Sequence, residues 1–479
     1  MLRRTISTVS HGLAIRSYAS NPGNVITELD SRGLIAQSTS TSLSQVCRDP
    51  LTVYCGIDPT APSLHLGNLL PLVTLLHFQL HGHHPIALIG GATGFIGDPS
   101  GRATERKLLD AVELERNVDS ISAQVHRFFH SARNYAARRT ATSSVPLSAP
   151  KVVNNLDWFQ DVRLLDFLRS SGKHAKVNTM LTRDSVSSRL KGSQGISFTE
   201  FTYQLLQAED FHHLHTNHGC RLQIGGSDQW GNIISGIELI RRRRNQHAME
   251  PTEESLAQES LETNASDDAY GLTIPLLTAP SGEKFGKSAG NAVWLDRGLT
   301  SVFDFYQYFM RVPDSMVSSL MAMFTLLPPD RLSEVMAQHQ ADPSERHGQR
   351  ALAAEVTELV HGLDGVRHAE AATRALFDAS PSDIDAADVI HALEGDPRLV
   401  HVTQNETWGK PLTSLMKTHG GHIGVVSRSH VERTLKAGGF YLNGVQVTDP
   451  RRTLAPDDGR IVVLRMGATN HLILAISNS

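Results

Sequence analysis

Two short segments of the chain carry residue types suited to chemistry on phosphate groups. Residues 54–68 read YCGIDPTAPSLHLGN, so an apolar run is followed by His65 and Asn68. Residues 281–288 read SGEKFGKS, with Lys284 and Lys287 three positions apart beside glycines. Two lysines on such a loop suit the negative charge that develops on phosphate oxygens in a transition state. Taken alone, the second segment is better explained as a solvated basic loop. Whether it acts on phosphate depends on the other motifs of the chain.

None of the glycine-bearing segments matches a common nucleotide-binding motif. The tail Gly286-Lys287-Ser288 resembles a P-loop, but that motif needs a glycine five residues before Gly286, where this chain has Ser281. Residues 90–101, GGATGFIGDPSG, lack the G-x-G-x-x-G spacing of dinucleotide-binding proteins. Their glycines either let the backbone approach a ligand or serve a tight turn, and glycine spacing leaves both readings open.

The elements that must position these segments alternate between strands and helices. Four apolar runs are typical of buried parallel strands, at 51–57, 85–93, 151–156 and 220–226. Helical patterns over 69–83 and 105–136 fit between them. The alternation predicts a doubly wound α/β sheet within residues 21–300, with ligands at the carboxyl ends of the strands. Low-complexity segments near 137–150 and 245–269 are expected to be surface insertions.

Two further units follow this sheet. Residues 301–380 have strongly helical patterns, and residues 381–404 are rich enough in Pro, Asp and Ser to predict a linker. Residues 405–479 predict a small α/β unit, in which Asn443-Gly444 between two apolar runs indicates a hairpin. This last unit has a net charge of +4, whereas the whole chain has -4. The chain is therefore no general binder of polyanions, but its basic tail could meet nucleic acid.

Composition also bears on where the protein works. The first 20 residues contain Arg3, Arg4 and Arg16, and no acidic residue precedes Glu28. Apolar residues recur there at helical spacing, which predicts a mitochondrial transit peptide over 1–20; the alternative is a frayed basic tail. The three cysteines form no CxxC pair, which fits a reducing compartment. No apolar run reaches the length of a transmembrane helix, so no membrane partner is expected.

Taken together, the motifs resemble those of the class I aminoacyl-tRNA synthetases. His65-Leu66-Gly67-Asn68 is similar to their HIGH motif, and KFGKS at 284–288 is similar to their KMSKS motif. Five further segments look like one group within this class, the tyrosyl-tRNA synthetases: Tyr54-Cys55-Gly56, Asp58-Pro59-Thr60, GGATGFIGDPSG, Tyr203 with Gln207 and Asp210, and QIGGSDQWGN at 223–232. The resemblance runs from about Leu51 into the C-terminal tail. Motifs in this order and at workable spacings form a specific pattern.

The resemblance implies three domains and one reaction. The domains are a Rossmann-like catalytic domain over 21–300, an α-helical anticodon-binding domain over 301–380 and an S4-like α+β RNA-binding domain over 405–479. Tyrosine and ATP would react to give tyrosyl-adenylate, and the tyrosyl group would pass to the 3′ end of mitochondrial tRNA-Tyr in the matrix. Mg²⁺ would accompany ATP without a protein ligand motif. Family members are homodimers, so a second copy of the chain is an expected partner.

The resemblance also gives expected roles to individual residues. Those expected to act on the reacting phosphates are Thr60, His65, Asn68, Lys284, Lys287 and Ser288. Those expected to bind tyrosine are Tyr54, Asp98, Tyr203, Gln207, Asp210, Gln223 and Gln229. Those expected around ATP are Cys55, Gly56, Asp58, His65, Gly67, Asn68, Gly226, Asp228, Lys284 and Lys287. Tyr54 and Asp210 would hold the substrate hydroxyl, so phenylalanine would leave buried polar groups unpaired.

The chain departs from the family motifs at two places. Asn68 replaces the second histidine of HIGH, whose role is a polar contact to the nucleotide. An asparagine amide can donate a similar hydrogen bond, so the chemistry should survive while the strength of one contact changes. KFGKS differs from KMSKS at its second and third positions but keeps both lysines.

Several alternatives are left by the sequence. A tryptophanyl-tRNA synthetase is disfavoured by Tyr54 with Asp210, since an indole offers no hydroxyl. An adenylate-forming ligase without an RNA substrate is disfavoured by the basic tail. A different class of function is binding of group I intron RNA, because some fungal mitochondrial tyrosyl-tRNA synthetases that resemble this chain help such introns fold. Histidine clusters at 81–84 and 212–218 lack the Cys or carboxylate pattern of zinc motifs, so no metal site is expected.

Overall fold

The structure is a computed structural model. The residues that it describes are 23–102, 104–106, 109–139, 149–192, 195–247, 269–278, 285–288, 291–377, 385–421, 427–467 and 470–477. The predicted transit peptide (1–20), most of the two predicted insertions and Lys284 lie outside these residues. Among the helices within them, none has the length and apolar character needed to cross a membrane.

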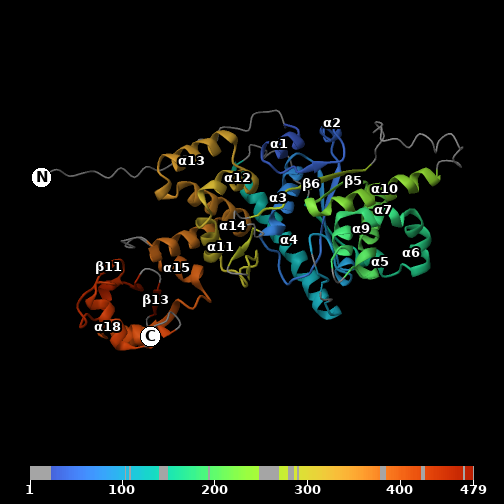
Figure 1. The fold of residues 1–479 in the computed structure, drawn as a ribbon. Helices are drawn as coiled ribbons and strands as arrows, with labels where there is room; N and C mark the ends of the chain where they lie inside the picture. Colours follow the sequence, from blue (N-terminus) through green and yellow to red (C-terminus); the bar gives the residue numbers. More distant parts are fainter. Residues whose placement is uncertain are drawn as a thin grey trace.

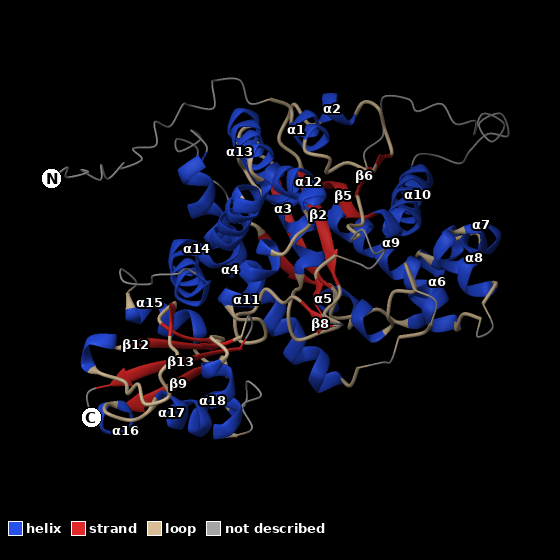
Figure 2. Ribbon diagram, turned by 60° about the vertical axis from the view of Figure 1, so that its left-hand side comes forward, coloured by secondary structure: helices blue, strands red, loops and turns tan. Residues whose placement is uncertain are grey.

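A six-stranded sheet forms the centre of the N-terminal part (Figures 1 and 2). Its spatial order is β1-β6-β5-β2-β3-β4. The strands are β1 (Gln37–Ser38), β2 (Thr52–Ile57), β3 (His84–Ile89), β4 (Lys151–Asn154), β5 (Cys220–Gly226) and β6 (Tyr270–Ile274). Only the short edge strand β1 is antiparallel to its neighbour, so the carboxyl ends of the other five meet at one edge. The four predicted strands are confirmed as β2 to β5.

Helices cover both faces of this sheet. On β2, Val53, Cys55 and Ile57 pack into one apolar cluster, whereas Tyr54 packs into another, because successive side chains of a strand point to opposite faces. The first face is covered by α3 (Leu66–Leu80) and α4 (Ala111–Arg139). The second face is covered by α9 (Phe198–His218) and α10 (Trp230–His247). The predicted doubly wound α/β architecture is confirmed.

Several local predictions differ from the structure. The helix predicted over 105–136 is α4, which begins only at Ala111 and continues to Arg139. Strands β1 and β6 were not predicted from the sequence. Six short helices also went unpredicted: α1 (Val25–Ser31), α2 (Leu43–Val46), α5 (Leu156–Phe159), α6 (Leu164–Ser170), α7 (Val177–Thr182) and α8 (Asp184–Leu190). Helices of this length show little periodicity and depend on tertiary packing for their stability.

A helical unit follows the sheet and shares its core. It contains α11 (Val302–Met310), α12 (Asp314–Phe324), α13 (Pro329–Ala341) and α14 (His347–Phe377). Phe305, Phe309 and Phe324 belong to the same apolar cluster as the buried residues of α3. The helical character predicted for this part of the chain is confirmed. Its shared core ties the helical unit directly to the helix that begins at His65.

The C-terminal unit is a five-stranded sheet in the order β11-β10-β12-β13-β9, with helices beside it. Its elements are α15 (Ala386–Leu393), β9 (Leu399–Thr403), α16 (Gln404–Thr407), α17 (Leu412–His419), α18 (Arg428–Lys436), β10 (Phe440–Leu442), β11 (Val445–Gln446), β12 (Ile461–Met466) and β13 (Asn470–Ser477). The predicted hairpin is confirmed, with Asn443 and Gly444 at positive φ.

The prediction of a linker over 381–404 is wrong for residues 385–404, which the structure describes. Residues of α15 pack against α11 and α14, and β9 pairs in parallel with β13, so this segment belongs to the fold. Its Asp and Pro residues cap and separate these two elements instead of marking a flexible connection. Val463 and Ile473 of the C-terminal sheet join the same apolar cluster as Phe303 of α11, so the two units are packed together.

A buried ionic network links the N-terminal α/β unit to the helical unit. Tyr135 Oη on α4 donates to Glu355 Oε2 on α14 at 2.6 Å and accepts from the backbone N–H of Leu326 at 3.1 Å. Arg139 donates to Glu355 Oε2 at 2.6 Å and to Glu358 Oε1 at 3.0 Å. Both glutamates are mostly buried and need compensating charge; Arg139 pairs with both of them, and Arg138 also pairs with Glu358.

Replacing Arg139 by methionine should therefore lower the free energy of unfolding by about 3 kcal/mol, because the buried Glu355 carboxylate loses its cationic partner while Glu358 keeps Arg138. Arg331→Met is the control, since its pair with Glu334 is exposed and should contribute at most about 0.5 kcal/mol. Urea unfolding of both variants and the wild type measures the difference. Equal losses in the two variants would contradict the assigned role of the network.

Candidate active site

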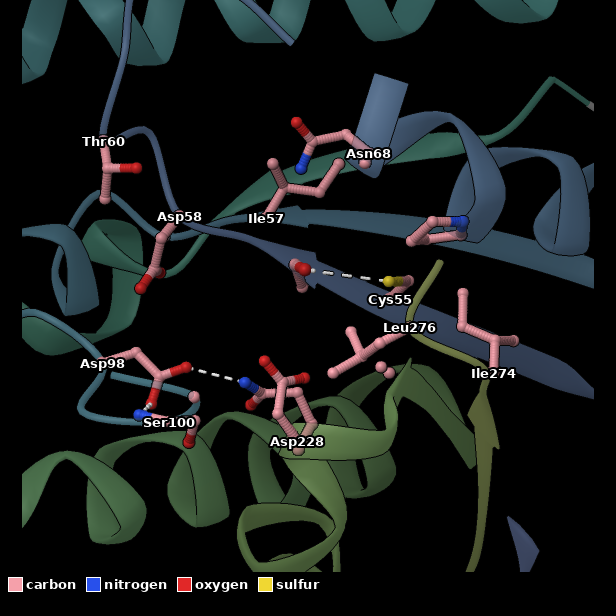
Figure 3. Close-up of a pocket in the computed structure, with 18 of the residues that line it drawn as sticks. Cys55, Ile57, Asp58, Thr60, Asn68, Asp98, Ser100, Asp228, Ile274 and Leu276 are labelled. Atoms are coloured by element: carbon pink, nitrogen blue, oxygen red, sulfur yellow. Dashed lines mark hydrogen bonds between the residues drawn. The ribbon is translucent and has the colours of Figure 1, made fainter. Parts of the chain in front are cut away.

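A cavity of about 710 Å³ opens at the carboxyl edge of the sheet. Every predicted site residue whose side chain the structure describes lines it: Tyr54, Cys55, Gly56, Asp58, Thr60, His65, Gly67, Asn68, Asp98, Tyr203, Gln207, Asp210, Gln223, Gly226, Asp228 and Gln229. In Figure 3, Thr60 and Asn68 lie on one side of this cavity, and Asp98, Ser100 and Asp228 lie on the other. The fold thus gathers residues from five separate segments around one volume.

The N-terminus of α3 forms one wall of the cavity. His65 is its N-cap residue, and the His65 Nδ1 atom accepts from the backbone N–H of Gly67 at 3.0 Å. Asn68 Oδ1 accepts from the backbone N–H of His65 at 3.0 Å, which completes a capping box. Asn68 therefore uses its oxygen to cap the helix, while its NH₂ group remains the donor for a ligand. The dipole of a helix start favours anions beside it, although the N–H groups of Leu66 and Gly67 are already engaged by Val293 O and His65 Nδ1.

The KFGKS segment lies directly against this helix start. Leu66 donates its backbone N–H to Val293 O at 3.0 Å, and Leu295 donates to Leu64 O at 2.8 Å. Gly286 has φ +89°, and a Cβ atom there would lie 2.8 Å from Leu66 Cβ, so the contact requires glycine. The two motifs predicted to act together therefore meet in the fold.

Three KFGKS residues have an expected role, and the structure describes the backbone of two of them. Lys287 and Ser288 form β7 (Lys287–Ser288), which pairs with β8 (Asn291–Ala292), and only their backbone is described. Lys284 lies outside the described residues. Gly286, the residue before Lys287, lines the cavity and lies beside Leu66 and Gly67.

Deep in the cavity, Tyr54 and Asp210 are both almost completely buried. Asp210 Oδ2 accepts from Asn155 Nδ2 at 3.0 Å, and its Oδ1 accepts from Trp158 Nε1 at 3.0 Å. Burial raises the pKa of Asp210 well above its ordinary value, although these two donors oppose the shift. The Tyr54 hydroxyl has no hydrogen-bond partner among the described residues. A buried phenol oxygen without a partner calls for a polar group on a ligand.

A second polar cluster lies between this end and the helix start. Asp98 accepts from Gln229 Nε2 at 2.7 Å and from the backbone N–H of Ser100 at 2.9 Å, as the dashed lines in Figure 3 show. Asn232 Nδ2 donates to Gln207 Oε1 at 3.0 Å and to Gln229 Oε1 at 3.1 Å. The carboxylate and amide groups are thus fixed relative to one another before any ligand arrives.

Asp58 lies in this cluster as well. Its two oxygens accept from Thr93 Oγ1 and Tyr203 Oη, both at 2.7 Å. Gly90 leaves room for it, because a Cβ there would lie 2.1 Å from Asp58 Oδ1. Asp58 was grouped with the ATP residues on sequence grounds. Its side chain instead contacts Tyr203, one of the residues expected to bind tyrosine.

Three residues of the site escaped the sequence analysis. Asn155 and Trp158 hold Asp210, and Asn232 joins the glutamines. A usable signal did exist for Asn155, because it lies near the carboxyl end of the predicted strand 151–156, which must reach the same edge of the sheet. Asn232 is the last residue of the QIGGSDQWGN segment, so that motif could have pointed to it. Trp158 lies on α5, and its sequence neighbours give no comparable indication.

The described residues hold no group of three or more His, Cys, Asp or Glu side chains placed to bind a metal ion. Cys55, expected near the ribose, is buried, and burial raises the pKa of its thiol to about 12. It remains a neutral thiol at physiological pH and can contribute only contact or a weak hydrogen bond.

Comparisons with known proteins agree with this geometry. A family model described as tRNA synthetases class I (W and Y) matches residues 47–378. The chain is 38% identical over 459 residues to tyrosine–tRNA ligase 2 of Bacillus cereus, covering 95% of this chain and 99% of that protein. It is 37% identical to the mitochondrial tyrosine–tRNA ligase of Drosophila melanogaster, across 99% of each.

A solved structure extends the agreement to the fold. The C-terminally truncated mitochondrial tyrosyl-tRNA synthetase of Aspergillus nidulans aligns with a TM-score of 0.63 and 34% identity, over 73% of this chain and 93% of that one. The sheet, the paired motifs at its edge and the family match define an ATP-using class I aminoacyl-tRNA synthetase. Within that class, the chain belongs to the tyrosyl-tRNA synthetase family. The intron-RNA alternative receives no support from these comparisons.

The titration of Asp58 gives a test of this site. Burial, reinforced by the Asp98 carboxylate, raises the pKa of Asp58 from 3.8 to about 6, against hydrogen bonds from Thr93 and Tyr203 and the charge of Arg106. The folded state therefore holds a proton that the unfolded chain releases between about pH 4 and pH 6, so this contribution to stability is lost as the pH rises through that window.

Asp58→Asn removes the titrating group. Between pH 4 and pH 7, the difference in unfolding free energy between variant and wild type should move in favour of the variant by up to about 3 kcal/mol. Urea unfolding at the two pH values measures it, with the exposed Asp330→Asn as control. A difference that does not depend on pH would show that Asp58 lies in a solvated environment.

Proposed function

We propose that this chain activates L-tyrosine with ATP and transfers it to mitochondrial tRNA-Tyr, with the cavity at the sheet edge as its active site. The observation that carries this proposal is the buried, unpartnered hydroxyl of Tyr54 beside Asp210. A substrate phenol can accept from Tyr54 and donate to Asp210, which satisfies both groups at once. An apolar substrate would leave both unsatisfied.

The remaining tyrosine contacts follow from the second cluster. The substrate ammonium is placed beside Asp98, Tyr203 and Gln207, and the carboxylate side chain of Asp58 adds negative charge there. The substrate carboxylate is placed near Gln229 and Gln223. The donor that Gln223 can offer this carboxylate is its Nε2 group, whereas its buried Oε1 atom, which has no hydrogen-bond partner in the described part of the chain, can accept only from a donor such as the substrate ammonium.

ATP occupies the half of the cavity that faces α3. Thr60 and His65 contact the leaving pyrophosphate, Asn68 donates its NH₂ group to the nucleotide, and Lys284 and Lys287 close over the phosphates with Ser288. Gly56, Gly67 and Gly226 leave space for the nucleotide, and Asp228 and Cys55 face the ribose. Mg²⁺ arrives with the ATP phosphates as part of the substrate and compensates their charge.

The reaction needs positioning and charge stabilisation. A tyrosine carboxylate oxygen attacks the α-phosphorus, the bond from this phosphorus to the bridging oxygen breaks, and the bond's electron pair leaves with pyrophosphate. Negative charge grows on phosphate oxygens at the start of α3, where the helix dipole and His65 stabilise it and where the two lysines are proposed to act. The 3′-terminal hydroxyl of the tRNA then attacks the tyrosyl carbonyl and releases AMP.

The helical unit and the C-terminal unit are proposed to bind the tRNA. The helical unit is proposed to bind the anticodon region of the tRNA, and the basic C-terminal unit, of S4-like type, to bind the rest. Relatives from Drosophila and yeast are mitochondrial enzymes, which together with the composition of residues 1–20 supports import into the mitochondrial matrix.

Homodimerisation is proposed from an exposed apolar surface. Nine of the sixteen exposed large hydrophobic residues in the described chain fall between Leu156 and Phe198, and Leu164, Leu165 and Phe198 are each more than 70% exposed. Figure 1 places α5, α6 and α7 at the edge of the molecule opposite the C-terminal unit. A clustered apolar surface of this kind is typical of a protein–protein interface, and the proposed occupant is a second copy of the chain.

Tyrosine-dependent ATP–pyrophosphate exchange tests the activity. Protein starting at Asn21 should exchange with tyrosine but give no measurable exchange with tryptophan. Exchange with phenylalanine should be roughly 10⁵-fold less efficient than with tyrosine, a discrimination for which tyrosyl-tRNA synthetases are themselves the standard example. Tyr54→Phe should reduce tyrosine-dependent exchange by about 5- to 100-fold through the lost hydrogen bond. Folded protein without exchange for any amino acid would overturn the proposed function.

The dimer has a separate test. The double variant Leu164→Glu/Leu165→Glu should convert a dimer into a monomer, because two charges would be buried without partners at the interface. Light scattering coupled to size-exclusion chromatography measures the mass. Leu363→Glu, at an exposed position of α14 outside this surface, should leave the dimer intact. A monomeric wild type, or a double variant of unchanged mass, would refute the proposed interface.

A further inference from the structure

The loop between β2 and α3 has few hydrogen bonds of its own. It carries Thr60 and ends at His65, both proposed to contact the nucleotide phosphates. Pro59 and Pro62 provide no backbone N–H, and the only backbone bond within the loop runs from Thr60 N to Asp58 O, at 2.9 Å. Buried backbone polar groups need partners, so some other element must supply them.

Helix α4 supplies these partners from one of its faces. Asn117 Nδ2 donates to Pro59 O at 3.1 Å, and Ser120 Oγ donates to Pro62 O at 2.8 Å. One turn further along, Gln124 Nε2 also donates to Pro62 O, at 3.3 Å. Residues spaced three or four apart share a face of a helix, so the three side chains form a single row along the loop.

Gln124 is the centre of this row. Its side chain is only 4% exposed. Its Oε1 atom accepts from Ser63 Oγ at 2.9 Å and from the backbone N–H of Leu64 at 3.0 Å, while Nε2 also donates to Ser120 Oγ at 3.1 Å. Both amide atoms are therefore fully engaged. Leu64 in turn pairs with Leu295, so Gln124 is linked to the KFGKS side of the site as well.

Helix α4 is itself held in place at its far end. Tyr135 and Arg139 are bound to Glu355 and Glu358 of α14. The helix cannot shift freely with the loop, so a side chain that connects the two fixes the loop against a rigid element. A misplacement of about 1 Å in groups that act on a reacting centre can cost roughly 10²-fold in rate.

We propose that Gln124 is a positioning residue for adenylate formation. It touches no substrate; it holds the loop from Asp58 to His65 so that Thr60 and His65 meet the phosphates at the start of α3. The inference rests on the proposed function, because it assumes that these two residues act on ATP. It adds a residue that none of the motifs contains.

The test is Gln124→Met, which keeps the length of the side chain and removes its hydrogen bonds. The kcat of tyrosine-dependent pyrophosphate exchange should fall by roughly 10- to 100-fold, as expected for a displaced loop. The dissociation constant for tyrosine, measured by equilibrium binding, should change by less than about twofold, because Tyr54 and Asp210 lie outside the loop and Asp58, its first residue, is held independently by Thr93 and Tyr203.

A double-mutant cycle separates positioning from general damage. Ser63→Ala removes one of the same hydrogen bonds from the loop side, so adding Gln124→Met to it should reduce kcat less than in the wild-type background. Gln349→Met is the matched control. Gln349 is equally buried and donates to Val312 O at 3.2 Å and to Asp314 Oδ1 at 2.5 Å within the helical unit, and its loss should leave kcat unchanged.

A folded Gln124→Met variant with wild-type kcat would overturn the inference, and so would a parallel loss of kcat and tyrosine affinity. Additive effects of Gln124→Met and Ser63→Ala would also contradict it. Absence of exchange in the wild type would be distinguishable from these outcomes, since it would overturn the proposed function and the inference with it.

Discussion

The backbone pairing between the start of α3 and residues 293–295 is the constraint on which the rest of the site depends. Leu66 of the first motif donates to Val293 O, and the Val293 N–H donates to Gly286 O of the KFGKS segment at 2.7 Å, so two motifs that lie far apart in the sequence are brought together. Because these are main-chain bonds, they do not require a particular side chain at Asn68 or Phe285. The chain can therefore depart from the HIGH and KMSKS patterns and still hold its two motifs in contact, provided that position 286 remains glycine.

At the end of the cavity proposed to bind tyrosine, the buried carboxyl groups make the free protein less stable. Asp58, Asp98 and Asp210 surround one volume, and burial raises the pKa of Asp58 and Asp210. Side-chain donors such as Tyr203, Gln229 and Asn155 offset part of this cost and fix the carboxyl groups. The charge of Arg106 offsets the burial of Asp58 only in part, so further positive charge is favoured there. A substrate that carries an ammonium group and a hydroxyl supplies both the charge and the partner for Tyr54.

The sequence predicted this site well where a motif and a strand end coincide. His65, Asp98 and Gln229 each follow a strand of a parallel sheet, so topology alone brings them to one edge. Asn155 could have been found by the same reasoning. Gln124 could not, because its partners are backbone atoms of a loop, and a polar residue on a helix looks solvated until the loop is seen to cover it. The linker prediction was wrong for a similar reason, because β9 is a strand only through its pairing with β13, which lies far along the chain.

The central claim is that one cavity holds tyrosine at Tyr54 and Asp210 and the nucleotide at the start of α3. A crystal structure of the protein with a non-hydrolysable tyrosyl-adenylate analogue tests this most directly. The account predicts the phenol oxygen within hydrogen-bond distance of Tyr54 Oη and Asp210, and the phosphate mimic beside His65 and the N-terminus of α3. An analogue bound with its phenol away from Tyr54, or with its phosphate mimic away from α3, would contradict it.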